Sequence, residues 1–210
     1  MKLLKFRNKN TANGASQQTL ESFSGLDAET SNEANASLVA HAMEMHGDMV
    51  LRLALSQVRN MPDAEDVFQD VFVRLMGAHV DFASSEHLKA WLIRATINRC
   101  RDVQRTRSRK LARTEPLNEY HAETLPDRTP APPGFEPDVW HAAGALPEDQ
   151  RIAVHLHYVE GYSTEEIACI ANCAPATIRT RLFRARETMR KELGGKQAIP
   201  APSKGEPHGQ

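Results

Sequence analysis

The chain has 210 residues, of which 40% are hydrophobic and 25% charged, so it can form one ordinary domain or two small ones with real cores. It contains no stretch of roughly 18 apolar residues that could span a membrane, and no apolar run of signal-peptide length follows its basic start. These absences predict a cytoplasmic protein without membrane insertion, and the net charge of −1 gives no sign by itself of a nucleic-acid partner.

The charges are segregated along the chain. Residues 94–113 carry eight bases and one acid, and residues 176–196 carry seven bases and two acids. Between them, residues 114–150 carry eight acids and one base. Two basic islands on a neutral chain predict two phosphate-facing surfaces.

The first half of the chain reads as a disordered extension followed by helices. Residues 1–35 are rich in Asn, Ser, Thr and Gln and show no sustained helical period, which predicts disorder. A helix is predicted over 36–59, where apolar residues recur three or four positions apart. A second helix begins near Met61 with acids in its first turn, where the helix dipole favours them.

A polar loop from about Gly77 to Ser85 separates the second helix from a third. The third helix buries Leu88, Trp91, Leu92 and Ala95, and it becomes strongly basic towards residue 113. Because Trp91 lies on the apolar stripe, a core position is favoured for it over a stacking role.

The second half begins with a linker. Residues 114–143 hold six prolines and are too polar for a core, so we expect a flexible linker there. Residues 144–193 read as a second helical unit, and residues 194–210 as a disordered tail. The predicted fold is therefore all-α, with two small helical domains joined by a linker.

The second unit carries a helix-turn-helix pattern. Ser163 and Glu166 fit a capping box that starts a short helix ending near Ala171. Asn172 tolerates the left-handed conformation that the turn needs, and Pro175 fits the first position of a longer basic helix. Ala174 is a poor cap for that helix.

The wheel of the longer helix separates an apolar face from a basic one. Ile178, Leu182, Ala185 and Met189 form the apolar face, and the opposite face centres on Thr180. Arginine beside Thr and Phe suits a DNA major groove, in which arginine reads guanine edges. The alternative interpretation is a solvated basic surface.

Both halves resemble the extracytoplasmic-function (ECF) sigma factors of bacterial RNA polymerase. In the first half the resemblance rests on Asp63-Ala-Glu-Asp-Val-Phe-Gln-Asp-Val-Phe-Val-Arg-Leu75, on Leu88-Lys-Ala-Trp-Leu-Ile-Arg-Ala-Thr-Ile-Asn98 and on the basic residues after it. In the second half it rests on Leu146-Pro-Glu-Asp-Gln-Arg151, Gly161-Tyr-Ser-Thr-Glu-Glu-Ile-Ala168 and Thr177-Ile-Arg-Thr-Arg-Leu-Phe-Arg-Ala-Arg186. Asn172 departs from the glycine usual in the family, and Ala174-Pro175 depart in the turn.

The resemblance implies a sigma region 2-like domain over 36–113 and a region 4-like domain over 144–193. It implies core RNA polymerase (clamp helices and flap), double-stranded and melted promoter DNA, and an anti-sigma factor as partners. The clamp-binding residues that it implies are Asp63, Glu65, Asp66, Gln69, Asp70 and Arg74.

The resemblance also assigns two DNA-binding sets. Residues for the downstream (minus-ten) element and melting would be Val80, Asp81, Phe82, Ala83 and Ser84 in a base pocket, with Lys89, Asn98, Arg101, Arg105 and Arg109 on the strand. Residues for the upstream (minus-thirty-five) element would be Thr177, Arg179, Thr180, Arg181, Phe183, Arg184 and Arg186.

Other function classes fit the sequence less well. The acids of 63–70 face outward without a histidine partner, so no metal, cofactor or enzymatic activity is predicted. A stand-alone helix-turn-helix regulator is the alternative function, but it leaves the first half unexplained. Cys100, Cys169 and Cys173 form no CxxC pair, as expected in a reducing compartment. A buried side chain is favoured for Cys173 over a redox sensor.

Overall fold

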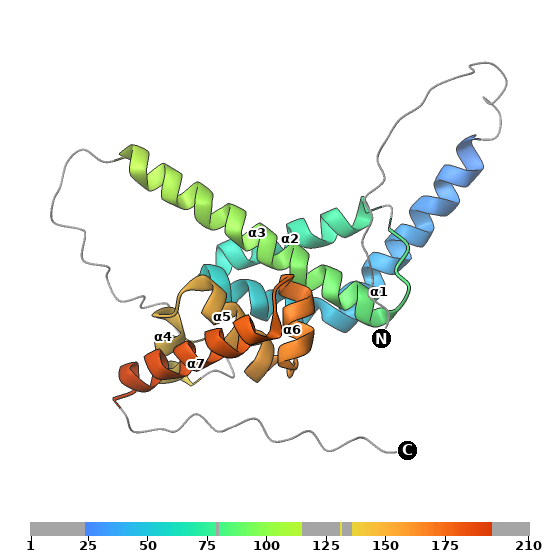
Figure 1. Cartoon of the computed structure of the whole chain (residues 1–210). Helices are drawn as coiled ribbons and strands as arrows, with labels where there is room; N and C mark the ends of the chain where they lie inside the picture. Colours follow the sequence, from blue (N-terminus) through green and yellow to red (C-terminus); the bar gives the residue numbers. More distant parts are fainter. Residues whose placement is uncertain (1–23, 79, 115–130, 132–135, 195–210) are drawn as a thin grey trace.

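The computed structural model describes residues 24–78, 80–114, 131 and 136–194, and its regular elements there are all helical (Figure 1). The predicted all-α class is confirmed. Predictions that fall on 1–23, 115–130, 132–135 and 195–210 lie outside the described residues. Among the described helices, none has the length and apolar character needed to cross a membrane.

The first domain consists of α1 (Ser24–Val58), α2 (Met61–Met76) and α3 (Ser85–Thr114). Their apolar stripes meet in one core, in which Leu53, Val67 and Leu92 are fully buried. The chain turns between α1 and α2 at Arg59, which has a φ of 60°, and Asn60 then caps α2 by accepting a hydrogen bond from the Asp63 N–H at 2.9 Å.

Helix α1 begins at Ser24, twelve residues before the predicted start. The prediction of disorder is therefore wrong for residues 24–35. Once the packed part of a helix has formed, each further residue adds a hydrogen bond without a new nucleation cost, so the helix can continue without an apolar stripe.

The second domain consists of α4 (Pro137–Gly144), α5 (Glu148–Val154), the π-helix η1 (His155–Val159), α6 (Thr164–Ala171) and α7 (Pro175–Glu192). Helix α4 lies within the predicted linker, so the boundary at residue 143 is wrong. Pro137 occupies the first turn, where a missing N–H is tolerated, and Trp140 and Ala142 are buried.

The two domains lie against each other. One apolar cluster runs from Leu53 and Leu92 of the first domain to Leu156, Ile167 and Ile178 of the second. Helices α5 and η1 contact α1, and α6 contacts α3 (Figure 1). The helices of the two domains therefore pack against each other, although α3 and α4 lie far apart in the sequence.

Candidate nucleic-acid interface

The helix-turn-helix has the local structure that the sequence predicts. Ser163 and Glu166 form the capping box of α6, with the Glu166 N–H 3.2 Å from Ser163 Oγ and the Ser163 N–H 2.8 Å from Glu166 Oε2. Asn172 ends α6 with a left-handed φ of 50°, and Pro175 lies in the first turn of α7, whose cap Ala174 makes no side-chain hydrogen bond.

The buried and exposed faces of α7 also match the predicted wheel. Ile178, Leu182, Ala185 and Met189 are all buried. Phe183 is 59% exposed although it is a large apolar side chain. The remaining upstream candidates are exposed at Thr177, Arg179, Thr180 and Arg184, and half-buried at Arg181 and Arg186. The structure therefore presents one aromatic ring and several guanidinium groups on one accessible helix.

Part of this face is hollowed. A surface depression of about 360 Å³ is lined by Ala176, Thr177, Thr180, Arg181 and Arg184 of α7 and by Gln150 of α5. Thr180 donates its hydroxyl hydrogen to the Ala176 carbonyl at 2.9 Å, and Arg179 lies 3.4 Å from the Glu165 carboxylate. Since that carboxylate is exposed, the ion pair leaves Arg179 free to exchange partners.

The loop before α3 holds together the residues predicted to form a base pocket. Phe82 is half-buried and packs edge-on against Trp91, with 5.9 Å between the ring centroids. Ser84 Oγ accepts a hydrogen bond from the His87 N–H at 3.2 Å, which fixes the end of the loop. Val80, Asp81, Ala83 and Ser84 are exposed. Trp91 is itself half-buried against the core, so it lies between Phe82 and the core and holds the Phe82 ring in place.

The residues of α3 that were predicted to hold the DNA strand divide into two groups. Asn98, Arg105 and Arg109 are exposed. Lys89 and Arg101 instead contact the second domain. The Lys89 ammonium lies 4.9 Å from the centre of the Tyr162 ring, and Arg101 lies 2.7 Å from Glu148 and 3.1 Å from Asp149. The sequence reasoning found these two basic residues but missed their partners.

The acidic helix α2 presents a mixed face. Glu65, Asp66, Gln69 and Arg74 are exposed, whereas Asp63 is half-buried beside Asn60 and Asp70 pairs with Arg99. The sequence reasoning missed two apolar members of this face, Val73 at 66% and Met76 at 48% exposure. The sequence could have revealed these two exposed residues, because both fall outside the apolar stripe of the helix.

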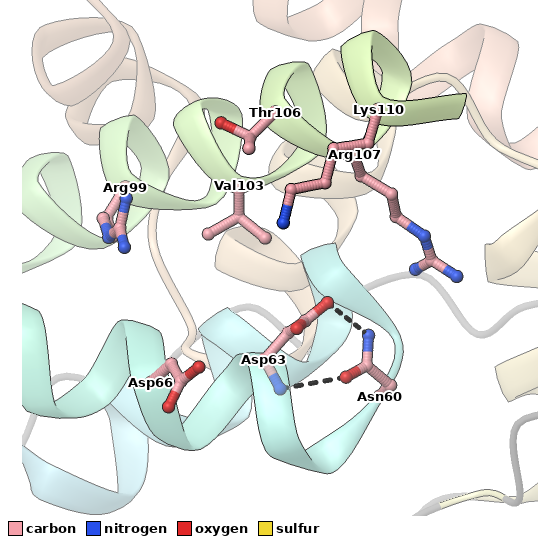
Figure 2. A pocket seen from close by; sticks show the side chains of 8 residues that line it. All are labelled: Asn60, Asp63, Asp66, Arg99, Val103, Thr106, Arg107 and Lys110. Carbon is pink, nitrogen blue, oxygen red and sulfur yellow. Dashed lines mark hydrogen bonds between the residues drawn. The ribbon is translucent and has the colours of Figure 1, made fainter. Parts of the chain in front are cut away.

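A groove of about 460 Å³ lies between the start of α2 and the distal half of α3, and Figure 2 shows the side chains that line it. Acids line the α2 side and bases the α3 side. The lining residues are Asn60, Asp63, Asp66, Arg99, Val103, Thr106, Arg107 and Lys110. Within the residues that the structure describes, no three His, Cys, Asp or Glu side chains gather as metal ligands would.

The cysteines differ in their surroundings. Cys100 is buried, and burial, aided by the nearby Glu148 carboxylate, raises the pKa of its thiol to about 12. A thiol with so high a pKa stays protonated and unreactive at neutral pH. Cys169 is exposed, and Cys173 packs against the core but is only half-buried, less than the buried side chain that the sequence predicts.

Comparisons with known proteins agree in both domains. Residues 42–110 match the family described as Sigma-70 region 2, and residues 138–189 match Sigma-70, region 4. The RNA polymerase sigma-H factor of Pseudomonas aeruginosa is 31% identical over 158 residues, which are 69% of this chain and 80% of that protein. The ECF RNA polymerase sigma factor SigE of Mycolicibacterium smegmatis is 32% identical over 161 residues, 72% of this chain and 60% of that protein.

A solved structure shares the fold. The sigma factor RpoE from Bartonella quintana, in complex with the anti-sigma factor NepR, has 24% sequence identity and a TM-score of 0.59. The match covers 75% of this chain and 98% of that one.

Proposed function

This chain belongs to the ECF sigma factors, and we propose that it reads two promoter elements with two separate surfaces. Sigma factors direct RNA polymerase in transcription initiation and are not enzymes. The observation that carries the proposal is the combination of an exposed basic recognition helix in one domain with an exposed acidic helix in the other. A stand-alone regulator would need the first but not the second.

The upstream element is read by α7. Phe183 and Thr180 contact thymine methyl groups, and Arg184 pairs with a guanine edge; the exposure of Phe183 and the position of Thr180 and Arg184 at the surface depression support these roles. Arg179, Arg181 and Arg186 flank these residues and hold phosphates, which fixes the register of the helix on the duplex.

The downstream element is melted and held by the loop before α3 and by α3 itself. The loop residues 80–84 form the pocket for an extruded base, with Phe82 supported by Trp91. Exposed Arg105 and Arg109 then guide the single strand along α3, together with Lys89 and Arg101 once these are accessible.

Core polymerase is bound by the exposed face of α2. Glu65, Asp66 and Gln69 pair with basic groups of the polymerase clamp helices, and the second domain contacts the flap. We add Val73 and Met76 to this surface, because exposed apolar groups rimmed by charges are typical of protein–protein interfaces.

This function also implies a regulatory partner and a cellular location. Because the RpoE structure is a complex with an anti-sigma factor, we propose that an anti-sigma factor also masks this chain. We propose that this chain acts in the cytoplasm, where bacterial transcription takes place.

The test is a runoff transcription assay with purified core polymerase on genomic fragments, followed by mapping of start sites. We expect Asp66→Lys to abolish runoff product and to weaken association with core polymerase, because it reverses a charge on the α2 face. Asp138→Lys is the matched control, since Asp138 is an exposed acid on α4, outside every proposed surface.

Two outcomes would contradict the proposal. One is a chain that never associates with core polymerase at any salt concentration. The other is tight promoter binding that is the same with and without polymerase, which would favour a stand-alone regulator.

A further inference from the structure

A hydrogen-bond acceptor without a donor lies beside the basic helix α7. Gln150, in the first turn of α5, lines the surface depression of about 360 Å³ together with residues of α7. Its Oε1 oxygen is buried and accepts no hydrogen bond within the residues that the structure describes. A buried acceptor without a donor costs free energy, and such groups are few in native proteins. Packing of the domain alone therefore gives no reason for an amide at this position.

The start of α5 is held against the middle of α7. The backbone N–H of Gln150 donates to the Pro147 carbonyl at 3.0 Å, and the adjacent Asp149 carboxylate pairs with Arg181 of α7 at 2.6 Å. Helices α5 and α7 also pack against each other (Figure 1). Because Arg181 itself lines the depression, these contacts hold Gln150 opposite the part of α7 that the proposed function places on DNA.

A donor without a partner lines the same depression. Arg184 is exposed, and among the described residues it makes no ion pair and no hydrogen bond. Arg181 is already paired with Asp149. Thr180 gives its hydroxyl hydrogen to the Ala176 carbonyl at 2.9 Å. Neither of these two side chains is therefore as available to a new acceptor as Arg184.

Thr177 is the other hydroxyl in the depression. Its side chain is short, whereas an arginine side chain ends in a planar fork with five N–H donors on a long flexible stem. Arg184 thus has both the reach and the spare hydrogens that the Gln150 oxygen lacks.

We propose that Gln150 is a positioning residue for base recognition, which accepts a hydrogen bond from Arg184 when α7 lies in the major groove and so holds that guanidinium in the orientation that pairs with guanine. This inference rests on the proposed function, because it takes Arg184 to read a guanine. It goes beyond that function by placing a residue that determines specificity outside α7.

The number of donors on arginine supports this arrangement. A bidentate pair with guanine uses two of the five N–H groups, one to O6 and one to N7. Water satisfies the other groups in the free chain, but contact with DNA removes much of that water, so a remaining N–H then needs a protein acceptor. The Gln150 side chain is only half-buried, so its amide can turn the oxygen towards the depression.

A held guanidinium affects specificity more than affinity. Because the fork is planar and rigid, a bond to one N–H fixes the direction of the others. An arginine without such a bond can swing to a phosphate when guanine is replaced by another base, and it then recovers part of the lost binding. An arginine held by Gln150 cannot, so the wrong base is penalised more strongly.

The test uses full-length variants bound to core polymerase. The probe is a labelled promoter duplex taken from a start site mapped by runoff transcription, with each guanine of the upstream element replaced in turn by adenine. Fluorescence anisotropy gives the affinity for each duplex, and the ratio of the guanine and adenine affinities is the preference at that position. The position that Arg184 reads is the one at which Arg184→Ala removes the preference.

Gln150→Leu removes the acceptor and keeps a side chain of similar size. We expect it to lower the guanine preference at the Arg184 position roughly fivefold, as the loss of one hydrogen bond would, and to leave the other positions unchanged. Its thermal stability should equal or exceed that of wild type, because an apolar group replaces an unpaired buried oxygen. A merely structural role would instead lower the stability and weaken binding to every duplex alike.

Two further variants frame this result. Gln150→Glu keeps an acceptor and should retain the guanine preference, although its negative charge weakens binding to all duplexes. Asp138→Asn is the matched control, since Asp138 is exposed on α4 and lines no part of the depression, and it should match wild type at every position.

A double-mutant comparison shows whether Gln150 acts through Arg184. In the Arg184→Ala chain, Gln150→Leu should change the affinity for no duplex, because the group that Gln150 orients is absent. An equal effect in both backgrounds would mean that Gln150 contacts the DNA itself or acts through Thr177, and this would overturn the positioning role.

The outcomes also separate this inference from the proposed function. If Arg184→Ala removes a guanine preference but Gln150→Leu leaves it intact, the positioning role is wrong and the proposed function stands. If Arg184→Ala changes the preference at no position, the assignment of Arg184 within the proposed function is wrong, and the role of Gln150 is wrong with it.

Discussion

Glu160 is expected to stabilise the folded chain through an ion pair between the domains, and Glu160→Gln tests this. The carboxylate follows η1 and accepts from Arg52 of α1 at 3.1, 3.2 and 3.3 Å, using both of its oxygens. Its side chain is only 6% exposed, whereas that of Arg52 is 42% exposed. His155 Nε2 lies 3.4 Å from the same carboxylate.

The size of the expected loss in stability follows from the difference in exposure between Glu160 and Arg52. A hydrogen bond to a charged group contributes about 1.5–3 kcal/mol, but the exposed guanidinium is partly screened by water. Glutamine keeps the shape and one acceptor oxygen. We therefore expect Glu160→Gln to lower the free energy of unfolding by about 1–2 kcal/mol near neutral pH.

The effect should depend on pH. Burial raises the pKa of Glu160, but hydrogen bonding and charge from His155, followed by Arg52, outweigh it and bring the pKa below its usual 4.5. A carboxyl whose pKa is lowered on folding adds stability above its unfolded pKa and loses it as the pH falls through the folded pKa. The difference between wild type and Glu160→Gln should thus be constant near neutral pH and shrink below about pH 4.5.

Urea unfolding followed by tryptophan fluorescence measures this difference, since Trp140 lies at the contact between the domains. The matched control is Glu165→Gln, which removes an exposed carboxylate paired with exposed Arg179 and should change stability little. Equal stability of Glu160→Gln and wild type at neutral pH would refute the reasoning. So would a difference that persists after Glu160 is protonated.

Three other predictions concern the second domain. Arg184→Ala should weaken promoter binding by about 1–3 kcal/mol if Arg184 pairs with a guanine, and an unchanged footprint at the upstream element would exclude that pairing. Ile178→Ala, at a fully buried position, should destabilise the domain by about 2–5 kcal/mol in thermal unfolding; retained binding to core polymerase would show that the first domain stays folded. Ser163→Ala removes half of the capping box and should cost about 1 kcal/mol, measured by denaturant unfolding against Thr164→Ala, which keeps the cap.

The sequence predicted the parts of the fold that depend on local pattern. Helix α2 was predictable because its apolar residues recur at helical spacing after Met61-Pro62, and the turn at Asn172 because few residues tolerate a left-handed φ. Helix α4 was not, because five of the six prolines in the predicted linker precede it and its eight residues hold only one large apolar anchor, Trp140. Its stability comes from packing that no local period reveals.

The candidate site was predictable only as sets of residue types. The spacing on α7 placed Thr180 and Arg184 on one exposed face, and the structure agrees, whereas their contacts with DNA remain predictions. The partners of Lys89 and Arg101 could not be found, since Tyr162 and Glu148 lie far away in sequence. The acids at 148–149 separate two basic stretches in the sequence, but in the fold they pair with both, with Arg101 of the first and, through Asp149, with Arg181 of the second.

The π-helical turn η1 sets the angular position of everything that follows it. Here the Glu160 N–H reaches back five residues to the His155 carbonyl, at 3.2 Å, so this turn holds one residue more than an α-helical turn. If the same residues wound as an α-helix instead, the chain that follows would be rotated by about 100° relative to α1. The Glu160 carboxylate would then leave Arg52. A homologue that is one residue shorter at this turn can wind it as an α-helix and still keep its DNA-facing helices in the same orientation.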